Sequence, residues 1–363
     1  MRLTWLTVLA LLLAACGTPG APPASAPGGA GGSPTAGMPQ ATRAQGAPAA
    51  PPRERIQVAY GAVTGVYAST FMAKDSGLFE QYGLDAELQM IPSGPTMVQG
   101  MLAGEIQFLE TSAPAPMAAV LEGGDTVWIT CPLDRPILLM AAAPDVGGLE
   151  DLRGRTVGAN RVGTLTYQLT RLALRTAGLE VNRDVTVQQV GGQPELVAAM
   201  VSGQVAAGLL APPAHLQATR AGLHVIANVA DLGILWPSAG AVSTRRQIDE
   251  QPERVRRYVQ AYTEGLYRFR ADRERGIDVL MKYAQIDDRA IAAETYDLLR
   301  ERFIAPPYPN RASFELVVQE DLAPTNPRAR EIPVESYYDD RFLRELDQAG
   351  FLRELDGRYP GAR

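Results

Sequence analysis

The sequence is poor in the residues that many catalytic and nucleic-acid-binding functions require. It has two cysteines, two histidines (His215 and His224) and only two lysines (Lys74 and Lys282). It contains no Cys-rich motif, metal-ligand cluster, G-x-S-x-G sequence or phosphate-binding loop, so we expect neither an enzyme nor a cofactor. The net charge is -6 and there is no basic cluster, so the sequence predicts no positively charged surface for nucleic acid. Beyond the first residues, no stretch approaches the run of about 20 apolar residues that a spanning helix needs.

The chain begins with the pattern of an export signal. Arg2 is followed by a short apolar run, Leu3–Leu13, and then by polar sequence. The run ends in Leu-Ala-Ala-Cys, which resembles the lipobox of bacterial lipoproteins, in which the cysteine is lipidated. We therefore expect a lipoprotein signal peptide over residues 1–16 that ends at a lipidated Cys16. A plain secretory signal with an incidental cysteine is the alternative.

A tether without a core is expected next. Residues 17–52 comprise 36 positions, of which 27 are Ala, Gly or Pro and only Arg43 is charged. Such a segment cannot bury enough apolar surface to fold, so we expect a disordered linker between a membrane and a folded body. If Cys16 is lipidated, Cys131 has no disulfide partner, and its expected role is that of a small buried apolar residue.

The remaining 311 residues alternate between strand and helix patterns. RIQVAY (55–60) has the composition of a strand, residues 69–83 form a helical pattern that stops at a glycine, and DAELQMI (85–91) is again extended. This alternation predicts parallel sheets with helical crossovers. The length exceeds what one hydrophobic core usually serves, so two lobes are expected.

One pattern occurs twice at a fixed offset of 99 residues. Without a gap, Met97–Val127 aligns with Leu196–Ile226, and seven positions are identical. The matches include glycines at the ends of helices and a proline at the start of one, which fix where the backbone turns. The alternative is that the match is coincidental, because any two βα units share some of these glycines and prolines. The repeat predicts two similar α/β lobes.

Several runs, in this order, carry a family resemblance: residues 60–88 (YGAVTGVYASTFMAKDSGLFEQYGLDAEL), 93–108 (SGPTMVQGMLAGEIQF), 148–179 (GLEDLRGRTVGANRVGTLTYQLTRLALRTAGL) and 197–213 (VAAMVSGQVAAGLLAPP). Their order and spacing resemble the solute-binding proteins of ABC importers. The group is the NMT1/THI5-like one, which includes binders of sulfonate, taurine, nitrate and thiamine-type pyrimidines. The resemblance covers nearly the whole body.

The resemblance implies a type II periplasmic-binding fold with α/β architecture. Two doubly wound lobes would be joined by two crossover strands, with a C-terminal helical segment packed on lobe 1. We expect lobe 1 to comprise residues 53–133 plus 239–363, and lobe 2 residues 134–238. The implied partners are a small-molecule solute and an ABC permease with its ATPase, and the protein would be a monomer that touches the membrane only through its lipid.

In an open α/β sheet the ligand lies beyond the carboxyl ends of the strands, where loops lead into helices. Loops rich in Gly, Ser and Thr let backbone N–H groups point into such a gap, although ordinary turn and cap chemistry is the alternative for each residue. The candidate ligand-binding residues are Thr64, Tyr67, Ser93, Gly94, Thr96, Glu110, Thr111, Ser112, Gly163, Thr164, Thr166, Tyr167, Gly192, Gln193, Pro212 and Trp236.

The candidate residues leave two solute classes open. Glu110 would repel a sulfonate, and aromatic residues such as Tyr67 and Trp236 could stack on a ring, which favours a planar heterocyclic or aromatic solute. Arg135 and Arg161 would favour a sulfonate- or taurine-like anion instead. An enzyme of the same fold that makes cofactor precursors, and a sensor not coupled to transport, are alternative functions. His215 could contact ligand but is more often a solvated helix residue.

Overall fold

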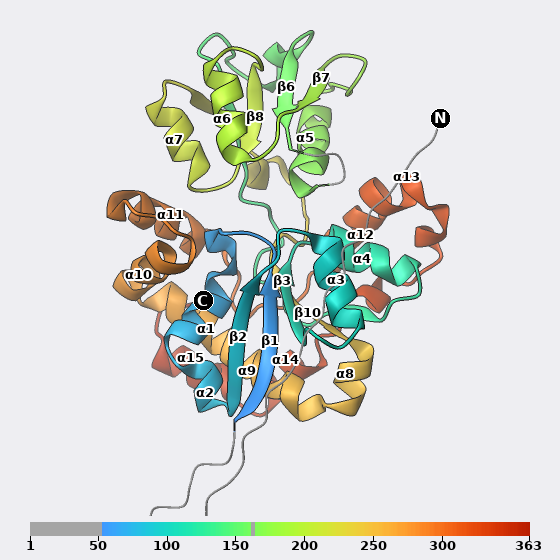
Figure 1. Cartoon of the computed structure of the whole chain (residues 1–363), viewed down its shortest axis with the longest axis vertical. Coiled ribbons are helices and arrows are strands. Elements are labelled where there is room, and N and C mark those ends of the chain that lie inside the picture. Colours follow the sequence, from blue (N-terminus) through green and yellow to red (C-terminus); the bar gives the residue numbers. More distant parts are fainter. Residues whose placement is uncertain (1–52, 161–163) are drawn as a thin grey trace, which may run out of the picture. The chain divides into compact units, whose positions relative to one another are not determined.

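The structure is a computed structural model, and it describes residues 53–160 and 164–363. The predicted signal peptide, the lipidated Cys16 and the tether lie outside the described residues, as do Arg161 and Gly163. The described chain is an α/β body with two five-stranded sheets (Figure 1), so the predicted fold class is confirmed. No helix in the described part combines the length and the apolar composition needed to cross a membrane.

The first sheet has the strand order β2-β1-β3-β10-β4. β1 pairs in parallel with β2 and β3, whereas β10 runs antiparallel to β3 and β4. Its strands are β1 (Glu54–Tyr60), β2 (Leu84–Met90), β3 (Phe108–Thr111), β4 (Thr126–Trp128) and β10 (Gly240–Thr244).

The second sheet repeats this arrangement with the order β7-β6-β8-β5-β9. β6 is parallel to β7 and β8, and β5 is antiparallel to β8 and β9. β5 therefore occupies the place that β10 has in the first sheet. The strands are β5 (Leu139–Ala142), β6 (Thr156–Ala159), β7 (Thr186–Gln189), β8 (Ala207–Leu210) and β9 (His224–Asn228).

Helices cover both faces of each sheet, because side chains alternate between the two faces along a strand. In β8, Leu209 belongs to the apolar cluster that contains Leu169 of α5, whereas Leu210 belongs to the cluster with Leu196 of α6. The helices up to the second sheet's last strand are α1 (Ala68–Asp75), α2 (Leu78–Gln81), α3 (Gly94–Leu102), α4 (Pro114–Leu121), α5 (Leu165–Thr176), α6 (Gln193–Val201) and α7 (Ala214–Arg220).

The secondary structure follows the predicted 99-residue repeat. α3 and α6 have the same bounds after the shift, and so do β3 and β8. The identical glycines explain why: Gly104 and Gly203 have φ of 85° and 75°, and Gly123 and Gly222 have φ of 88° and 92°. Only glycine adopts this left-handed conformation without a steric penalty, so both copies place it where a helix must end.

Two connections join the sheets. The chain leaves the first sheet after β4 and enters the second at β5, and it returns from β9 through the 3₁₀-helix η3 (Val229–Leu232) to β10. A bridge between Leu133 and Ala239 brings the two connections together. These two connections are the crossovers that the family resemblance implies. The residue boundaries of the two lobes stay a prediction.

The chain after β10 is helical. Apolar residues recur along the longest of these helices, α9, at the spacing of an amphipathic helix, and four of them are each at most 1% exposed: Val255, Val259, Tyr262 and Leu266. The segments are α8 (Arg245–Glu250), α9 (Pro252–Ala271), α10 (Arg273–Tyr283), α11 (Arg289–Arg302), α12 (Arg311–Val317), the π-helical turn η4 (Val318–Leu322), α13 (Ala323–Thr325), α14 (Arg341–Gln348) and α15 (Phe351–Arg358).

These C-terminal helices contact β4 of the first sheet and α5, which packs on the second sheet. Phe314 of α12 packs edge-to-face on Trp128 of β4, with ring centroids 5.7 Å apart. On the other side, Asp321 in η4 accepts a hydrogen bond from Gln168 of α5, and Glu320 pairs with Arg175 of the same helix. The segment that was expected to pack on lobe 1 therefore also reaches α5.

Cys131 is a buried free thiol, as the sequence predicted. Burial raises the pKa of the Cys131 thiol far above its usual range, so the nucleophilic thiolate is scarce. In a Cys16→Ser variant, where Cys131 is the sole thiol, we expect no labelling by Ellman's reagent in the native state and one thiol per chain in guanidinium. Rapid labelling of native protein would contradict the burial.

Candidate functional site

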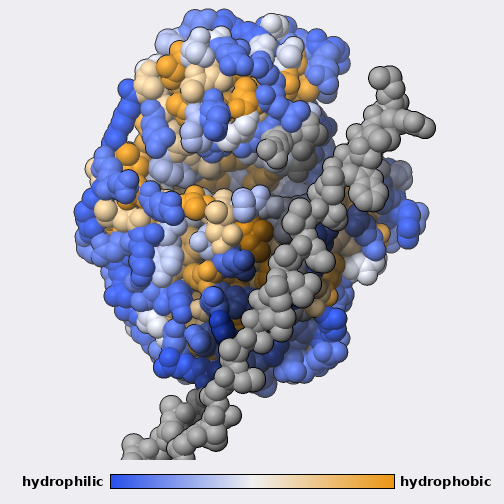
Figure 2. Space-filling view, in the orientation of Figure 1, coloured by the Kyte–Doolittle hydropathy of each residue, from blue (hydrophilic) through white to orange (hydrophobic). Residues whose placement is uncertain are grey.

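A cavity of about 500 Å³ lies at the carboxyl ends of β1, β3, β6 and β8. Figure 2 shows pale and orange residues in the recess across this face, whereas the surrounding surface is mostly blue. The position is the one at which open α/β sheets bind ligands. The described lining residues are Ala62, Val63, Thr64, Val66, Tyr67, Ser112, Leu133, Pro136, Ile137, Leu138, Asn160, Leu165, Thr166, Gln193, Pro194, Ala211, Pro212, Pro213, Ala214, Gln217, Ser238, Ala284 and Gln285.

Close packing positions the wall on the side of the first sheet. The 3₁₀-helix η1 (Gly65–Tyr67) follows β1, and a Cβ on Gly65 would lie 2.6 Å from Cδ1 of Leu299. A side chain at this position would force Leu299 to shift, so glycine allows the turn to pack closely on α11. Tyr67 is buried and packs edge-to-face on Phe71, with centroids 6.4 Å apart. Burial raises the pKa of the Tyr67 hydroxyl, so it stays a neutral hydrogen-bonding group.

On the side of the second sheet, side chains hold the helix starts in place. Oε1 of Gln193, the first residue of α6, accepts a hydrogen bond from the backbone N–H of Ala211 at 2.9 Å. This bond ties the loop after β8 to α6 and leaves the side-chain NH₂ of Gln193 as a donor. Thr164 caps α5 by accepting from the N–H of Tyr167 at 3.4 Å.

Six of the sixteen candidate residues lie on the cavity wall: Thr64, Tyr67, Ser112, Thr166, Gln193 and Pro212. They come from both sheets' loops, so the structure brings these six together. Nine others lie off the wall, and Gly163 is not among the described residues. As ligand contacts, all sixteen stay predictions.

Several residues off the wall have structural roles. Ser93 caps α3: its Oγ accepts from the N–H of Thr96 at 3.3 Å and from the Thr96 hydroxyl at 2.8 Å. A Cβ on Gly94 would lie 2.8 Å from the Cβ of Ala115, so this glycine allows α3 to approach α4. Thr111 is buried, and Thr164, Tyr167 and Gly192 belong to the starts of α5 and α6.

Glu110 and Trp236 are core residues. Both are 0% exposed, and Oε1 of Glu110 accepts a hydrogen bond from the hydroxyl of Tyr258 at 3.0 Å. Burial raises the pKa of Glu110 to about 8, and the hydrogen bond from Tyr258 offsets part of this effect. The carboxyl group therefore lies behind the wall and is largely protonated at neutral pH.

The other charged or titratable candidates are not on the wall either. Arg135 is exposed on the first crossover, and Arg161 is outside the described residues. His215 is 8% exposed in α7, and burial lowers its pKa, so it is a neutral interior imidazole. None of the candidates Glu110, Arg135 and His215 is among the described lining residues, and this affects which solutes the cavity can bind.

The sixteen candidates do not include three carboxamides on the wall, Asn160, Gln217 and Gln285. Asn160 directly follows β6, so its position at a strand end was the available signal. Gln285 lies between α10 and α11, far from the predicted loops, and has a left-handed φ of 52°. Such a conformation is uncommon outside glycine and is found more often at functional sites.

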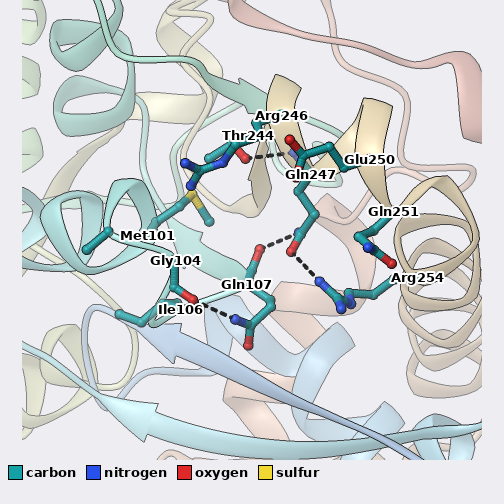
Figure 3. Close-up of a pocket in the computed structure, with 11 residues that line it drawn as sticks. Met101, Gly104, Ile106, Gln107, Thr244, Arg246, Gln247, Glu250, Gln251 and Arg254 are labelled. Carbon is teal, nitrogen blue, oxygen red and sulfur yellow. Dashed lines mark hydrogen bonds between the residues drawn. The ribbon is translucent and has the colours of Figure 1, made fainter.

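A second cavity, of about 330 Å³, lies at the opposite end of the first sheet (Figure 3). Its polar groups bond to one another: the Gln247 side chain donates to the carbonyl of Gln107 at 2.8 Å, and Gln107 donates to the carbonyl of Gly104 at 3.0 Å. Because these groups already have partners and the strands' amino ends face them, this cavity is the weaker candidate for a solute.

Residues 49–277 match the sequence profile of the NMT1-like family. The chain belongs to this family. A relative from Brucella abortus (strain 2308), provisionally named a binding protein, is 27% identical over 257 residues, which cover 66% of this chain and 76% of the relative. The predicted resemblance to the NMT1/THI5-like group is therefore confirmed.

Solved structures share the fold of this NMT1-like protein. The periplasmic aliphatic sulphonate binding protein SsuA from Escherichia coli matches with a TM-score of 0.65 and 22% identity, over 76% of this chain and 88% of SsuA. The periplasmic nitrate-binding protein NrtA from Synechocystis PCC 6803 matches with a TM-score of 0.64 and 15% identity, over 82% and 89%. At these identities the likeness shows the fold.

Proposed function

We propose that this protein is the extracytoplasmic solute-binding component of an ABC importer. The observation that carries the proposal is the cavity at the carboxyl ends of four strands, two from each sheet. Family membership supports it, as do the names of the relatives, which describe binding proteins and periplasmic binding components. The solute is a planar heterocycle, an aromatic or pyrimidine-like compound, or a sulfonate- or taurine-like anion.

We further propose that lobe 1 (53–133 plus 239–363) and lobe 2 (134–238) close on the solute about the two crossovers. Closure would present a surface to the permease and its ATPase. The lipid on Cys16 would hold the monomeric body beside that transporter. Binding without turnover is favoured because the described lining residues include no His, Cys, Lys, Asp or Glu to act as a base or acid.

The proposal is tested by a thermal-shift screen of sulfonates, nitrate, pyrimidine precursors and aromatic acids. A solute at about 100 times its dissociation constant should add about 2.7 kcal/mol to the free energy of unfolding. An Ala62→Trp variant, which fills the cavity from an exposed wall position, should lose this gain. The matched Ala312→Trp variant, exposed on α12 and off the wall, should keep it.

The same screen tests the competing functions. Chemical conversion of a bound compound would indicate an enzyme of the same fold. If the solute-loaded protein does not stimulate ATP hydrolysis by its reconstituted permease, a sensor is favoured over an importer component. Equal loss of the ligand-induced shift in both tryptophan variants would show that the cavity is not the site.

A further inference from the structure

The described residues that line the strand-end cavity carry no charge. None of its described residues is Asp, Glu, Lys, Arg or His, and most are aliphatic or proline. An ion that leaves water for such a wall loses hydration that no opposite charge replaces, and this cost is several kcal/mol unless strong donors compensate. The cavity therefore disfavours solutes that carry a net charge.

Prolines remove backbone donors from part of this wall. Pro136, Pro194, Pro212 and Pro213 line the cavity and have no N–H. Pro194 is the second residue of α6, where a free N–H would otherwise point at an anion, and the N–H of Ala211 already donates to Gln193. A sulfonate or nitrate needs several donors converging on its oxygens, and the four prolines and the engaged N–H of Ala211 supply none.

Four carboxamides, together with the hydroxyls of Thr64, Tyr67, Ser112, Thr166 and Ser238, supply the directional chemistry of the wall. Asn160, Gln193, Gln217 and Gln285 come from four separate segments: the end of β6, the start of α6, α7, and the loop between α10 and α11. Each carboxamide can both donate and accept a hydrogen bond. Oδ1 of Asn160 is buried and has no hydrogen-bond partner among the described residues, so it is an acceptor that awaits a donor.

We infer that the cavity takes an uncharged solute with an apolar skeleton and a group that both donates and accepts hydrogen bonds, such as an amide or lactam. This inference rests on the proposed function and narrows its solute class. The N–H of such a group pairs with Oδ1 of Asn160, and its carbonyl accepts from a carboxamide NH₂, such as that of Gln193. The aliphatic wall covers the skeleton.

Matched pairs of probes that differ in charge and not in shape test the inference. p-Toluenesulfonamide is compared with p-toluenesulfonate, and benzamide with benzoate, by calorimetric titration of the purified protein at pH 7. We expect each uncharged member to bind at least tenfold more tightly than its ionised partner. Equal or tighter binding of the ionised members overturns the inference, and so does the absence of binding by both uncharged probes at 10 mM.

An Asn160→Leu variant separates a ligand contact from a structural role. Leucine has a similar volume and removes a buried acceptor that has no partner, so we expect no loss of thermal stability. The affinity for benzamide should fall at least tenfold. Gln99→Leu, an exposed carboxamide on α3 that is off the wall, is the matched control and should change neither. Unchanged benzamide affinity in Asn160→Leu overturns the assignment.

The two proposals fail in different ways. High-affinity capture of an ionised solute, with stimulation of the permease, would overturn the inference of an uncharged solute. It would leave the proposed function as a solute-binding component intact. Turnover of a probe, or a permease that ignores the loaded protein, would count against the proposed function while the preference for uncharged probes persists.

Discussion

Replacing Glu110 by glutamine will change how the stability of this protein depends on pH. We expect the unfolding free energy of Glu110→Gln, relative to wild type, to increase by about 4 to 5 kcal/mol between pH 4 and pH 9. The reason is that burial raises the pKa of Glu110 to about 8. Glutamine resembles the protonated carboxyl group and can still accept from Tyr258.

The sign follows from proton binding. Between the ordinary carboxyl pKa and about 8, the folded protein keeps a proton at Glu110 that the unfolded chain has released. Wild-type stability therefore falls as pH rises through this window, and the contribution is fully lost above about pH 8. Glutamine does not titrate, so the variant escapes this loss.

Denaturant titrations at intervals of one pH unit measure the effect as a difference between variant and wild type, which cancels the other carboxyl groups. Glu294→Gln, an exposed position on α11, is the control and should track wild type. A Glu110→Gln curve parallel to wild type across the range would show that Glu110 is ionised in the folded state.

Replacing Gly265 by alanine will destabilise the protein by about 3 kcal/mol or more. Gly265 lies within α9 where α1 crosses it, and a Cβ there would lie 2.4 Å from the carbonyl oxygen of Ser69 and 2.9 Å from the Cβ of Ala73. The first contact is with backbone, which cannot rotate away. The two helices must therefore separate, which opens the core around α9.

Gly357→Ala is the matched control. Gly357 is also inside a helix, α15, and a Cβ there meets nothing within 4 Å. Because alanine favours a helix over glycine, this variant should be stabilised by about 0.5 to 1 kcal/mol. Urea denaturation measures both variants. Similar stabilisation of Gly265→Ala and Gly357→Ala would mean that α1 and α9 are not in close contact.

Much of the fold was predictable because its turns depend on residues with a strong backbone preference. Gly104 and Gly203 are identical in the two repeats and share a left-handed φ, so a sequence match at these positions reports a structural match. Val255 and Val259 showed the core face of α9 through their spacing. Such signals are local, so they predict turns and core-facing positions whatever the tertiary arrangement.

The site was less predictable than the fold. The strand ends predict which loops meet, but the orientation of each side chain decides whether it faces the cavity. Ser93 and Ser112 are both serines, yet the hydroxyl of Ser93 caps α3 whereas Ser112 lines the wall. Glu110 is the penultimate residue of β3, directly before Thr111, and its side chain is buried in the core. Gln285 is brought to the wall by a long helical excursion that no local pattern predicts.

The place of β10 has a consequence for biosynthesis. It lies between β3 and β4, so β4 has no ladder partner in the first sheet until Gly240–Thr244 has left the ribosome. All five strands of the second sheet, from Leu139 to Asn228, emerge before that point. The second sheet, which begins later in the sequence, can therefore be completed first. The first sheet remains unpaired at β4 until β10 is available.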